Sequence, residues 1–296
     1  MASLPDTDTI DLLRTRARHH AEHFTLPLRD RNWRGKTGEH AGTGSGSSLD
    51  FQDHRVYLPG DDPRHINWQA YARSGQYSLK LYREEVRPVV EILFDISGSM
   101  FADQPKAIRS LELLFFAIAS AEFSAAMVSL FLLKDRRWKL IPRPTYSGQA
   151  WLAEIGTDQV TESSLPPNVA EAPLKPRSLR VLVSDLLYPA EPDSLLRALT
   201  REGGKGLVLA PFAETEEDPP WRGNCEFADT ESRILHHRRV DSSLLLRYRT
   251  AYRDHFARWK AASRRYQVPL GRIPSTGSFE ESLRSEALPS GVIQLS

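Results

Sequence analysis

Residues 89–99 read VVEILFDISGS, a run typical of a buried strand followed by a short polar turn. Residues 89–94 are mostly β-branched or otherwise apolar, and Pro88 before them suits the start of a strand. Downstream, residues 105–125 place apolar side chains at nearly helical spacing, with a proline in the first turn, where helices accept it. The stretch therefore predicts a strand, a loop and a crossover helix.

The same alternation of apolar runs and amphipathic stretches continues towards the C-terminus. An antiparallel edge strand is expected at residues 138–141 and a helical stretch at 149–155. Because strands that alternate with helices form mostly parallel sheets covered on both faces, we predict a doubly wound α/β fold. The remaining expected strands are 127–133, 179–184, 207–212 and 268–273, and the remaining helices are 192–202 and 241–266.

The first 87 residues follow a different pattern. Residues 8–24 predict a helix, and the Gly- and Ser-rich stretch 42–48 predicts a flexible connector, since it lacks the Gly-Lys-Ser/Thr ending of a nucleotide-binding loop. Residues 49–85 are rich in aromatic, Arg and His residues around a turn at 59–63, which favours short strands. We therefore predict a helical segment at 1–41, a small β-rich module at 42–87 and the α/β domain at 88–296.

The composition of the whole chain restricts its partners and its compartment. Its 296 residues include 39 Lys and Arg against 38 Asp and Glu, so no overall field attracts nucleic acid or anionic lipid. Cys225 is the only cysteine, which excludes an intrachain disulfide and favours an inert thiol in a reducing compartment. There is no apolar core of a signal peptide and no apolar run of roughly 20 residues. We expect a cytoplasmic protein with no nucleic-acid partner and no direct membrane insertion.

Oxygen-bearing side chains follow two of the predicted strands. Asp95, Ser97 and Ser99 alternate along an extended loop, so their side chains can converge on one point. Asp185 follows the later apolar strand at the same end of the sheet, and neighbouring strands lie only about 4.8 Å apart. Two carboxylates that close repel unless one is protonated or a cation lies between them. Hard oxygen ligands suit Mg²⁺, so we predict a magnesium site formed by these four residues.

Other interpretations of the same residues remain open. Asp and Ser after a strand are also common helix caps and turn formers. The run lacks the flanking glycines of a hydrolase nucleophile elbow. A magnesium-dependent phosphoryl-transfer enzyme would use Asp95 as its nucleophile, but Ser97 stands where such a loop is expected to carry a second carboxylate.

The turn Asp95-Ile96-Ser97-Gly98-Ser99 resembles the metal-ion-dependent adhesion site of von Willebrand factor A domains. The preceding sequence is similar to the signature of the bacterial domain of unknown function 58 family. The residues that carry this second resemblance are 51–68, which read FQDHRVYLPGDDPRHINW, then Ala72-Arg73 and Arg83-Glu84-Glu85. The likeness extends from about residue 42 to Asp185, and more loosely over 248–266.

These resemblances imply a von Willebrand factor A-like sheet with a small N-terminal β-rich extension and no established enzymatic activity. Members of the bacterial family are often encoded beside MoxR-type AAA ATPases, which implies an adaptor that works with such an ATPase on a client complex. Its bound Mg²⁺ would keep one position open for an acidic side chain of a protein partner. A second loop usually adds a Thr ligand, for which this sequence offers only Thr145 or Ser147. If the site is vestigial, the N-terminal β module would bind instead.

The basic and aromatic cluster of the N-terminal module also has two interpretations. Basic side chains interleaved with aromatic ones can stack on single-stranded nucleic acid. Acidic residues lie close by in the sequence and would repel phosphates, so we favour internal salt bridges and aromatic packing. The cluster comprises Arg64, Trp68, Arg73 and Arg83, and the acidic residues are Asp53, Asp61, Asp62, Glu84 and Glu85.

Overall fold

A computed structural model describes residues 4–28, 49–84, 87–134, 137–146, 148–155, 167–230 and 234–296 of the chain. The chain divides into two compact units. The larger unit combines Met1–Asp30 with Pro88–Ser296, and the smaller unit is Arg31–Arg87. Each unit is described by itself below.

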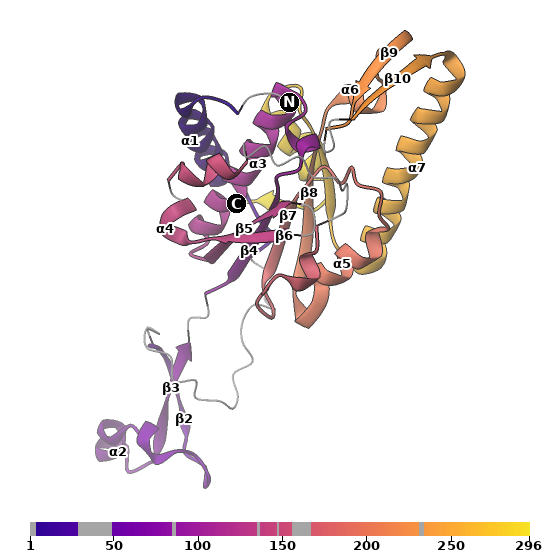
Figure 1. Ribbon diagram of the computed structural model, residues 1–296. Helices are drawn as coiled ribbons and strands as arrows, with labels where there is room; N and C mark the ends of the chain where they lie inside the picture. The colour runs from indigo at the N-terminus through magenta and orange to yellow at the C-terminus, as the bar shows by residue number, and fades with distance from the viewer. Residues whose placement is uncertain are drawn as a thin grey trace. The chain divides into compact units, whose positions relative to one another are not determined.

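A six-stranded sheet forms the centre of the larger unit (Figure 1). Its order is β11-β8-β7-β4-β5-β6, and every neighbouring pair is parallel except β5 with β6. This confirms the predicted mostly parallel α/β sheet with an antiparallel edge strand. The strands are β4 (Val89–Asp95), β5 (Met127–Lys134), β6 (Arg137–Ile141), β7 (Leu179–Val183), β8 (Lys205–Phe212) and β11 (Leu270–Pro274).

The strand order reverses between β4 and β7. The chain runs outward from β4 through β5 to β6, then returns to β7 on the other side of β4 and continues outward through β8 to β11. In open α/β sheets, a crevice forms beyond the carboxyl ends of the strands at such a reversal, and ligands bind there. The predicted ligands follow these two strands, so the topology directs attention to the ends of β4 and β7.

Helices cover both faces of this sheet (Figure 1). On one face, α1 (Thr7–His23) packs against α3 (Gln104–Phe123), which is buried almost all round. On the other face, α5 (Pro192–Thr200) packs against α7 (Ser242–Tyr266). That second layer shares one apolar core with the strands, in which Leu93, Leu182 and Val208 meet residues such as Trp259.

Shorter elements complete the larger unit. The helical stretch expected at 149–155 is the 3-10 helix η4, whereas neither the β9–β10 hairpin nor the C-terminal helices were expected from the sequence. The remaining elements are β1 (Phe24–Thr25), η3 (Gly98–Phe101), α4 (Arg143–Tyr146), η4 (Ala150–Glu154), η5 (Val169–Glu171), η6 (Arg201–Gly203), α6 (Glu214–Glu217), β9 (Gly223–Ala228), β10 (Leu235–Val240), α8 (Phe279–Ser282), the π-helix η7 (Leu283–Ala287) and β12 (Gln294–Leu295).

Helix α1 belongs to the larger unit rather than standing apart as a helical segment. Its apolar face, Ile10, Leu13, Ala17 and Ala21, is buried, and the chain after it forms β1, which pairs with β12 near the C-terminus. The helix therefore helps to close the core that residues 88–296 form.

The smaller unit is a two-stranded antiparallel sheet with short helices in its connection. Strand β2 (Leu49–Val56) pairs with β3 (Ser78–Glu84), and η2 (Pro63–His65) and α2 (Trp68–Ser74) lie between them in the chain. The turn at 59–63 is followed by helical structure. Asn67 caps the start of α2, and Gly75 ends the helix with a positive φ of 68°. From the sequence we expected only short strands around that turn.

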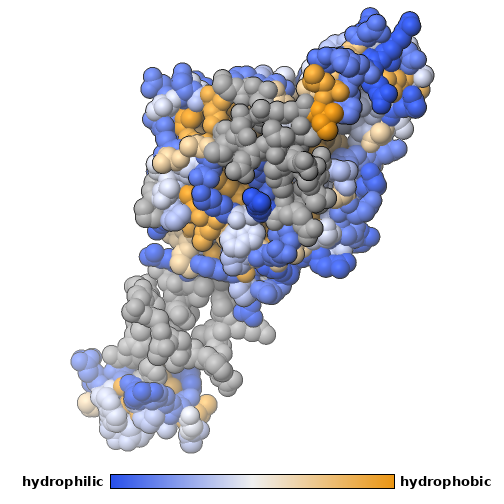
Figure 2. Space-filling view, viewed as in Figure 1, coloured by the Kyte–Doolittle hydropathy of each residue, from blue (hydrophilic) through white to orange (hydrophobic). Residues whose placement is uncertain are grey.

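The surface of the larger unit is mixed in character. Figure 2 shows a largely hydrophilic hairpin and adjoining end of α7, with hydrophobic residues scattered elsewhere on the visible face. Within the described ranges, no helix is long and apolar enough to cross a membrane.

Candidate metal centre

The turn after β4 brings the three oxygen-bearing side chains of the motif together. Asp95 ends β4, and its Oδ1 accepts a hydrogen bond from the backbone N–H of Ser97 at 2.9 Å. Ser97 precedes η3, but its hydroxyl does not cap that helix. Instead, its Oγ lies 3.2 Å from the Oγ of Ser99. Ser97 is therefore not a helix cap, but Asp95 does stabilise the turn, because it accepts the N–H two residues further on, as Asp185 does from Leu187.

The end of β7 lies directly beside this turn. Phe94 pairs with Val183 in the parallel ladder, and the next residue, Ser184, donates its hydroxyl to Asp95 Oδ2 at 2.6 Å. The backbone N–H of Asp185 points to Met100 Sδ at 3.1 Å, and the Oδ1 of Asp185 accepts the backbone N–H of Leu187. The structure thus brings all four predicted ligands, Asp95, Ser97, Ser99 and Asp185, to one end of two adjacent strands.

The electrostatic environment of Asp95 disfavours its charge. Burial raises the pKa of Asp95, the nearby charge of Asp185 raises it further, and hydrogen bonds from Ser184 and Ser97 only partly offset these effects, so that its pKa is about 7. No cation neutralises the carboxylate of Asp95, since none of the described Lys, Arg or His residues forms an ion pair with it. A carboxylate in this situation gains stability from a proton or from a bound cation.

Lys106 is the main residue of the site that was not predicted from the sequence. Its side chain is only 1% exposed, and its Nζ donates to Asp185 Oδ2 at 2.7 Å and to Glu216 Oε1 at 2.5 Å. Burial alone would lower the pKa of Lys106, but the charges of Asp185 and Glu216 outweigh it and raise the pKa, which keeps the ammonium charged. Burial of Glu216 raises its own pKa, although the charge of Lys106 opposes this shift.

The sequence did contain a signal for Lys106, although none for Glu216. Lys106 and Arg109 interrupt a helix that is otherwise strongly apolar, and both side chains are buried. A charged residue at a helix position that faces the core needs a buried partner of opposite charge, so Lys106 could have been singled out from the sequence as one side of a buried ion pair. Glu216 comes from α6 in a run of acidic residues, where the sequence gives no reason to choose it.

Thr145 and Ser147 were the candidates for an additional ligand from a second loop. Thr145 is exposed in α4, and within the described part of the chain its side chain forms no hydrogen bond with the turn after β4. The loop that follows is held by α1, because Arg14 donates to the backbone carbonyl of Gly148. Ser147 lies outside the described residues.

The donor set is chemically suited to a small hard cation. Asp95 supplies a carboxylate without a counter-charge, and Ser97 and Ser99 supply two adjacent hydroxyls, which are the oxygen ligands that Mg²⁺ accepts. Asp185 is less available, because one of its oxygens accepts Lys106 and the other accepts a backbone N–H. Asp95, Ser97 and Ser99 are therefore the residues that could bind Mg²⁺ directly, with Asp185 beside them.

The basic and aromatic cluster of the smaller unit is partly held by ion pairs and ring contacts within that unit. Arg64 forms an ion pair with Asp62 at 2.7 Å and Arg55 forms one with Asp61 at 2.6 Å, and Trp68 contacts the rings of Tyr71 and Tyr77. These contacts agree with the interpretation as salt bridges and aromatic packing. The side chains of Asp53, Arg83 and Glu84, and the whole of Glu85, lie outside what the structure describes.

The chain matches a known protein family. The family described as "Protein of unknown function DUF58" matches residues 53–260 of the chain. No curated protein and no solved structure matches it. The matched range contains β4, β7 and every residue of the candidate metal centre.

Proposed function

From the premise that the chain belongs to the DUF58 family, whose function is unknown, we propose that it is a non-enzymatic, Mg²⁺-dependent protein-binding adaptor. The ion would lie at the ends of β4 and β7, bound by Asp95, Ser97 and Ser99, with Asp185 beside it. One coordination position would remain open for an Asp or Glu side chain of a protein partner. The ion would therefore be the centre of the binding surface.

The observation that carries this proposal is the unbalanced charge of the centre. Asp95, Asp185 and Glu216 are three carboxylates, whereas Lys106 is the only cation in ion-pair contact with any of them among the described residues. When all of these groups are ionised, two negative charges remain, which is the charge that one divalent ion neutralises. A buried excess of charge is costly unless a proton or a metal ion compensates it.

The topology and the family resemblance supply the rest of the proposal. A parallel sheet that reverses between the strands bearing Asp95 and Asp185 supports a von Willebrand factor A-like domain. The resemblance to bacterial proteins encoded beside MoxR-type AAA ATPases supports such an ATPase as the partner, in the assembly or maturation of a client complex. Both assignments are part of the proposal, as is a cytoplasmic location.

The residues of the turn give less support to phosphoryl transfer by Asp95. Ser97 stands where a second catalytic carboxylate would be needed. Turnover of a phosphorylated substrate that is lost in Asp95→Asn would favour the enzyme over the adaptor.

Calorimetric titration with Mg²⁺ tests the metal site. We expect Asp95→Asn and Ser99→Ala to abolish or strongly weaken Mg²⁺ binding. The control is Ser124→Ala, which removes a hydroxyl after the end of α3 that donates to the Ser120 carbonyl, and it should leave binding unchanged. Equal binding by the wild type and both site variants would remove the metal from the proposal.

The pH dependence of the same titration has a defined sign. Mg²⁺ binds the deprotonated form of Asp95, whose pKa is about 7. The affinity for Mg²⁺ should therefore fall between pH 8 and pH 6, and below pH 6 the loss should approach about tenfold for each unit of pH. In the metal-free protein the unfolded chain loses this proton near pH 4, whereas the folded protein keeps it until about pH 7. This group therefore makes the metal-free fold less stable as pH rises from 4 to 7, and Mg²⁺ should reverse that trend.

Affinity capture tests the adaptor role. The immobilised wild-type protein should retain an ATPase or client subunit in buffer with Mg²⁺ and release it when EDTA is added. The Asp95→Asn variant should retain neither protein in either buffer. Capture that is insensitive to both EDTA and the substitution would contradict a metal-centred interface.

A further inference from the structure

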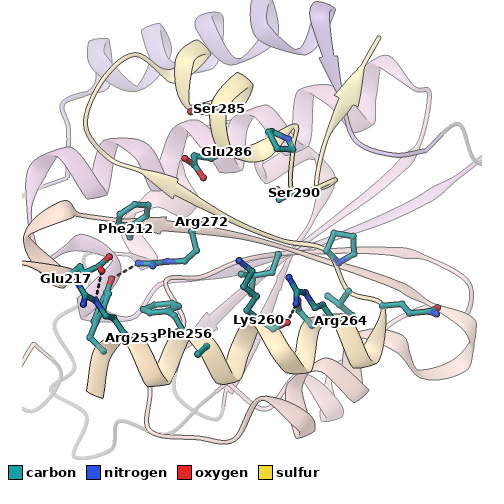
Figure 3. Close-up of a pocket in the computed structure, with 18 residues that line it drawn as sticks. Phe212, Glu217, Arg253, Phe256, Lys260, Arg264, Arg272, Ser285, Glu286 and Ser290 are labelled. Atoms are coloured by element: carbon teal, nitrogen blue, oxygen red, sulfur yellow. Dashed lines mark hydrogen bonds and ion pairs between the residues drawn. The ribbon is translucent and has the colours of Figure 1, made fainter. Parts of the chain in front are cut away.

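A groove lies at the β11 edge of the sheet (Figure 3). Strand β8 separates β11 from β7, the nearer of the two strands that carry the candidate metal centre. Its volume is about 1020 Å³, and it is lined by β11, the second half of α7 and the C-terminal residues 285–290. Figure 3 shows Lys260 and Arg264 rising from α7, Arg272 extending from β11, and Glu286 on the opposite side. Phe212 of β8 and Glu217 of α6 complete the lining.

Arg272 is the fixed cation of this groove. Its guanidinium lies 3.8 Å from the centre of the Phe256 ring and 4.3 Å from that of Phe212, and its Nη2 donates to the Tyr252 hydroxyl at 2.6 Å. The Nε of Arg272 is buried and has no hydrogen-bond acceptor. No carboxylate among the described residues forms an ion pair with Arg272. A partly buried guanidinium held between aromatic rings, with unused donors and no counter-charge, favours a carboxylate ligand.

Two more cations lie along the same wall. Lys260 and Arg264 are four residues apart on α7, so they share one face of the helix, and neither forms an ion pair with a described carboxylate. Arg253 also lines the groove but is already paired with Glu217 at 3.1 Å. Glu286 is therefore the single unpaired acidic side chain facing three unpaired cations in the described lining, which leaves the groove positive.

The backbone of β11 offers a further means of recognition. Pro269 accepts a hydrogen bond from Val208 of β8, and Ser275 donates one to Phe212, so alternate residues from 269 to 275 face β8. Leu270 and Arg272 have the opposite parity and turn their backbone N–H and C=O groups towards the open edge. An extended peptide can pair with such groups, whereas a free phosphate cannot use the alternating donors and acceptors.

We propose that this groove binds an extended acidic segment of a protein partner, with a carboxylate anchored on Arg272 and further carboxylates beside Lys260 and Arg264. None of the residues proposed to bind the segment is a proposed Mg²⁺ ligand, so binding itself needs no metal ion.

Fluorescence anisotropy tests this site with a labelled eight-residue peptide of alternating leucine and glutamate, in buffer that contains EDTA. We expect the wild-type protein to bind it at least about tenfold more tightly than the same peptide with glutamine in place of glutamate, because charge-assisted pairs distinguish the two. Arg272→Gln and the double variant Lys260→Gln/Arg264→Gln should each lose at least about fivefold in affinity. Arg258→Gln is the control, since Arg258 lies on the same helix but pairs with Glu191, outside the groove.

The double variant keeps the test decisive if Arg272→Gln fails to fold, because Lys260 and Arg264 are exposed. Equal affinity for the two peptides, equal losses in the double variant and Arg258→Gln, or displacement of the peptide by an equal concentration of inorganic phosphate would overturn the proposal. Because EDTA is present throughout, a failed Mg²⁺ titration does not affect this result.

Discussion

The ammonium group of Lys106 neutralises part of the charge that the predicted metal site carries. It contacts Asp185 and Glu216 but not Asp95, so the protein supplies a cation of its own to one side of the centre and leaves the other side to a proton or a metal ion. An ammonium tethered to α3 cannot leave the site when conditions change. Lys106 therefore sets how much negative charge remains for a divalent ion.

Lys106→Met should strongly destabilise the fold. It leaves Asp185 and Glu216 buried without their cation, and removal of one partner of a buried pair costs about 3–5 kcal/mol. Urea unfolding at pH 8 without Mg²⁺ measures this cost. The matched control is Lys139→Met, which breaks an exposed pair with Glu154 and should cost less than about 1 kcal/mol. Similar losses in the two variants would mean that the buried contacts of Lys106 add nothing.

Individual site residues differ in how far the sequence could predict them. Asp95, Ser97 and Ser99 are adjacent in the chain, and Asp185 follows a clear strand, so alternation and strand ends were enough to place them together. Lys106 and Glu216 are 110 residues apart, and only the folded chain brings them into contact. No local pattern encodes such a pair, which is why the charge balance of the centre emerged only from the structure.

At the scale of elements, the contact between α1 and α3 depends on a narrow apolar stripe. Ala17 and Ala21 are only 1% and 3% exposed, and such small side chains allow close approach of the two helices, with Ile10 and Leu13 extending the contact. The following strand β1 then pairs with β12. Residues 4–28 thus help to form the core of the larger unit.

Leu13→Ala should destabilise the protein by about 2–5 kcal/mol, because it removes a large side chain that is only 3% exposed. The neighbouring Leu12 is 47% exposed in the same helix, so Leu12→Ala should change stability by no more than about 0.5 kcal/mol. Thermal or urea unfolding of the two variants gives the comparison. If both substitutions were neutral, α1 would not be part of the cooperative core.

Strong periodicity explains which elements the sequence predicted well. The strand expected at 89–94 is β4, and the helix expected at 105–125 is α3 within two residues at either end. The β9–β10 hairpin was missed because its exposed strands, including His236 and Arg238, lack the alternation of apolar and polar residues on which a strand prediction rests. Helix α2 was missed because it has no buried side chain and hence no apolar stripe.

At the scale of the molecule, the two units have very different cores. The larger unit buries a continuous apolar cluster between its sheet and helices, whereas Leu79 is the only buried apolar side chain among those described in the smaller unit. A small unit with little buried apolar surface is only marginally stable on its own. The two units are therefore expected to open independently.

Hydrogen exchange measured by mass spectrometry should show this difference. Amides of β2 and β3 should exchange at least about a hundredfold faster than those of β4 and β7, which are buried in the central sheet. Saturating Mg²⁺ should slow exchange in the segment 95–101 and leave β2 and β3 unchanged. Equal protection of the two units in the absence of Mg²⁺ would contradict independent opening.

A continuous series of polar contacts joins the two proposed sites. Asp185 accepts Lys106, Lys106 also donates to Glu216, the Tyr252 hydroxyl lies 3.3 Å from Glu216 Oε2, and Arg272 donates to that hydroxyl. If an acidic segment drew Arg272 away from Tyr252, the hydrogen bonding of Glu216 and Lys106 would rearrange, and with it the field at the cation. Thermodynamic reciprocity then requires that magnesium alter the affinity for the segment by the same factor as the segment alters that for magnesium.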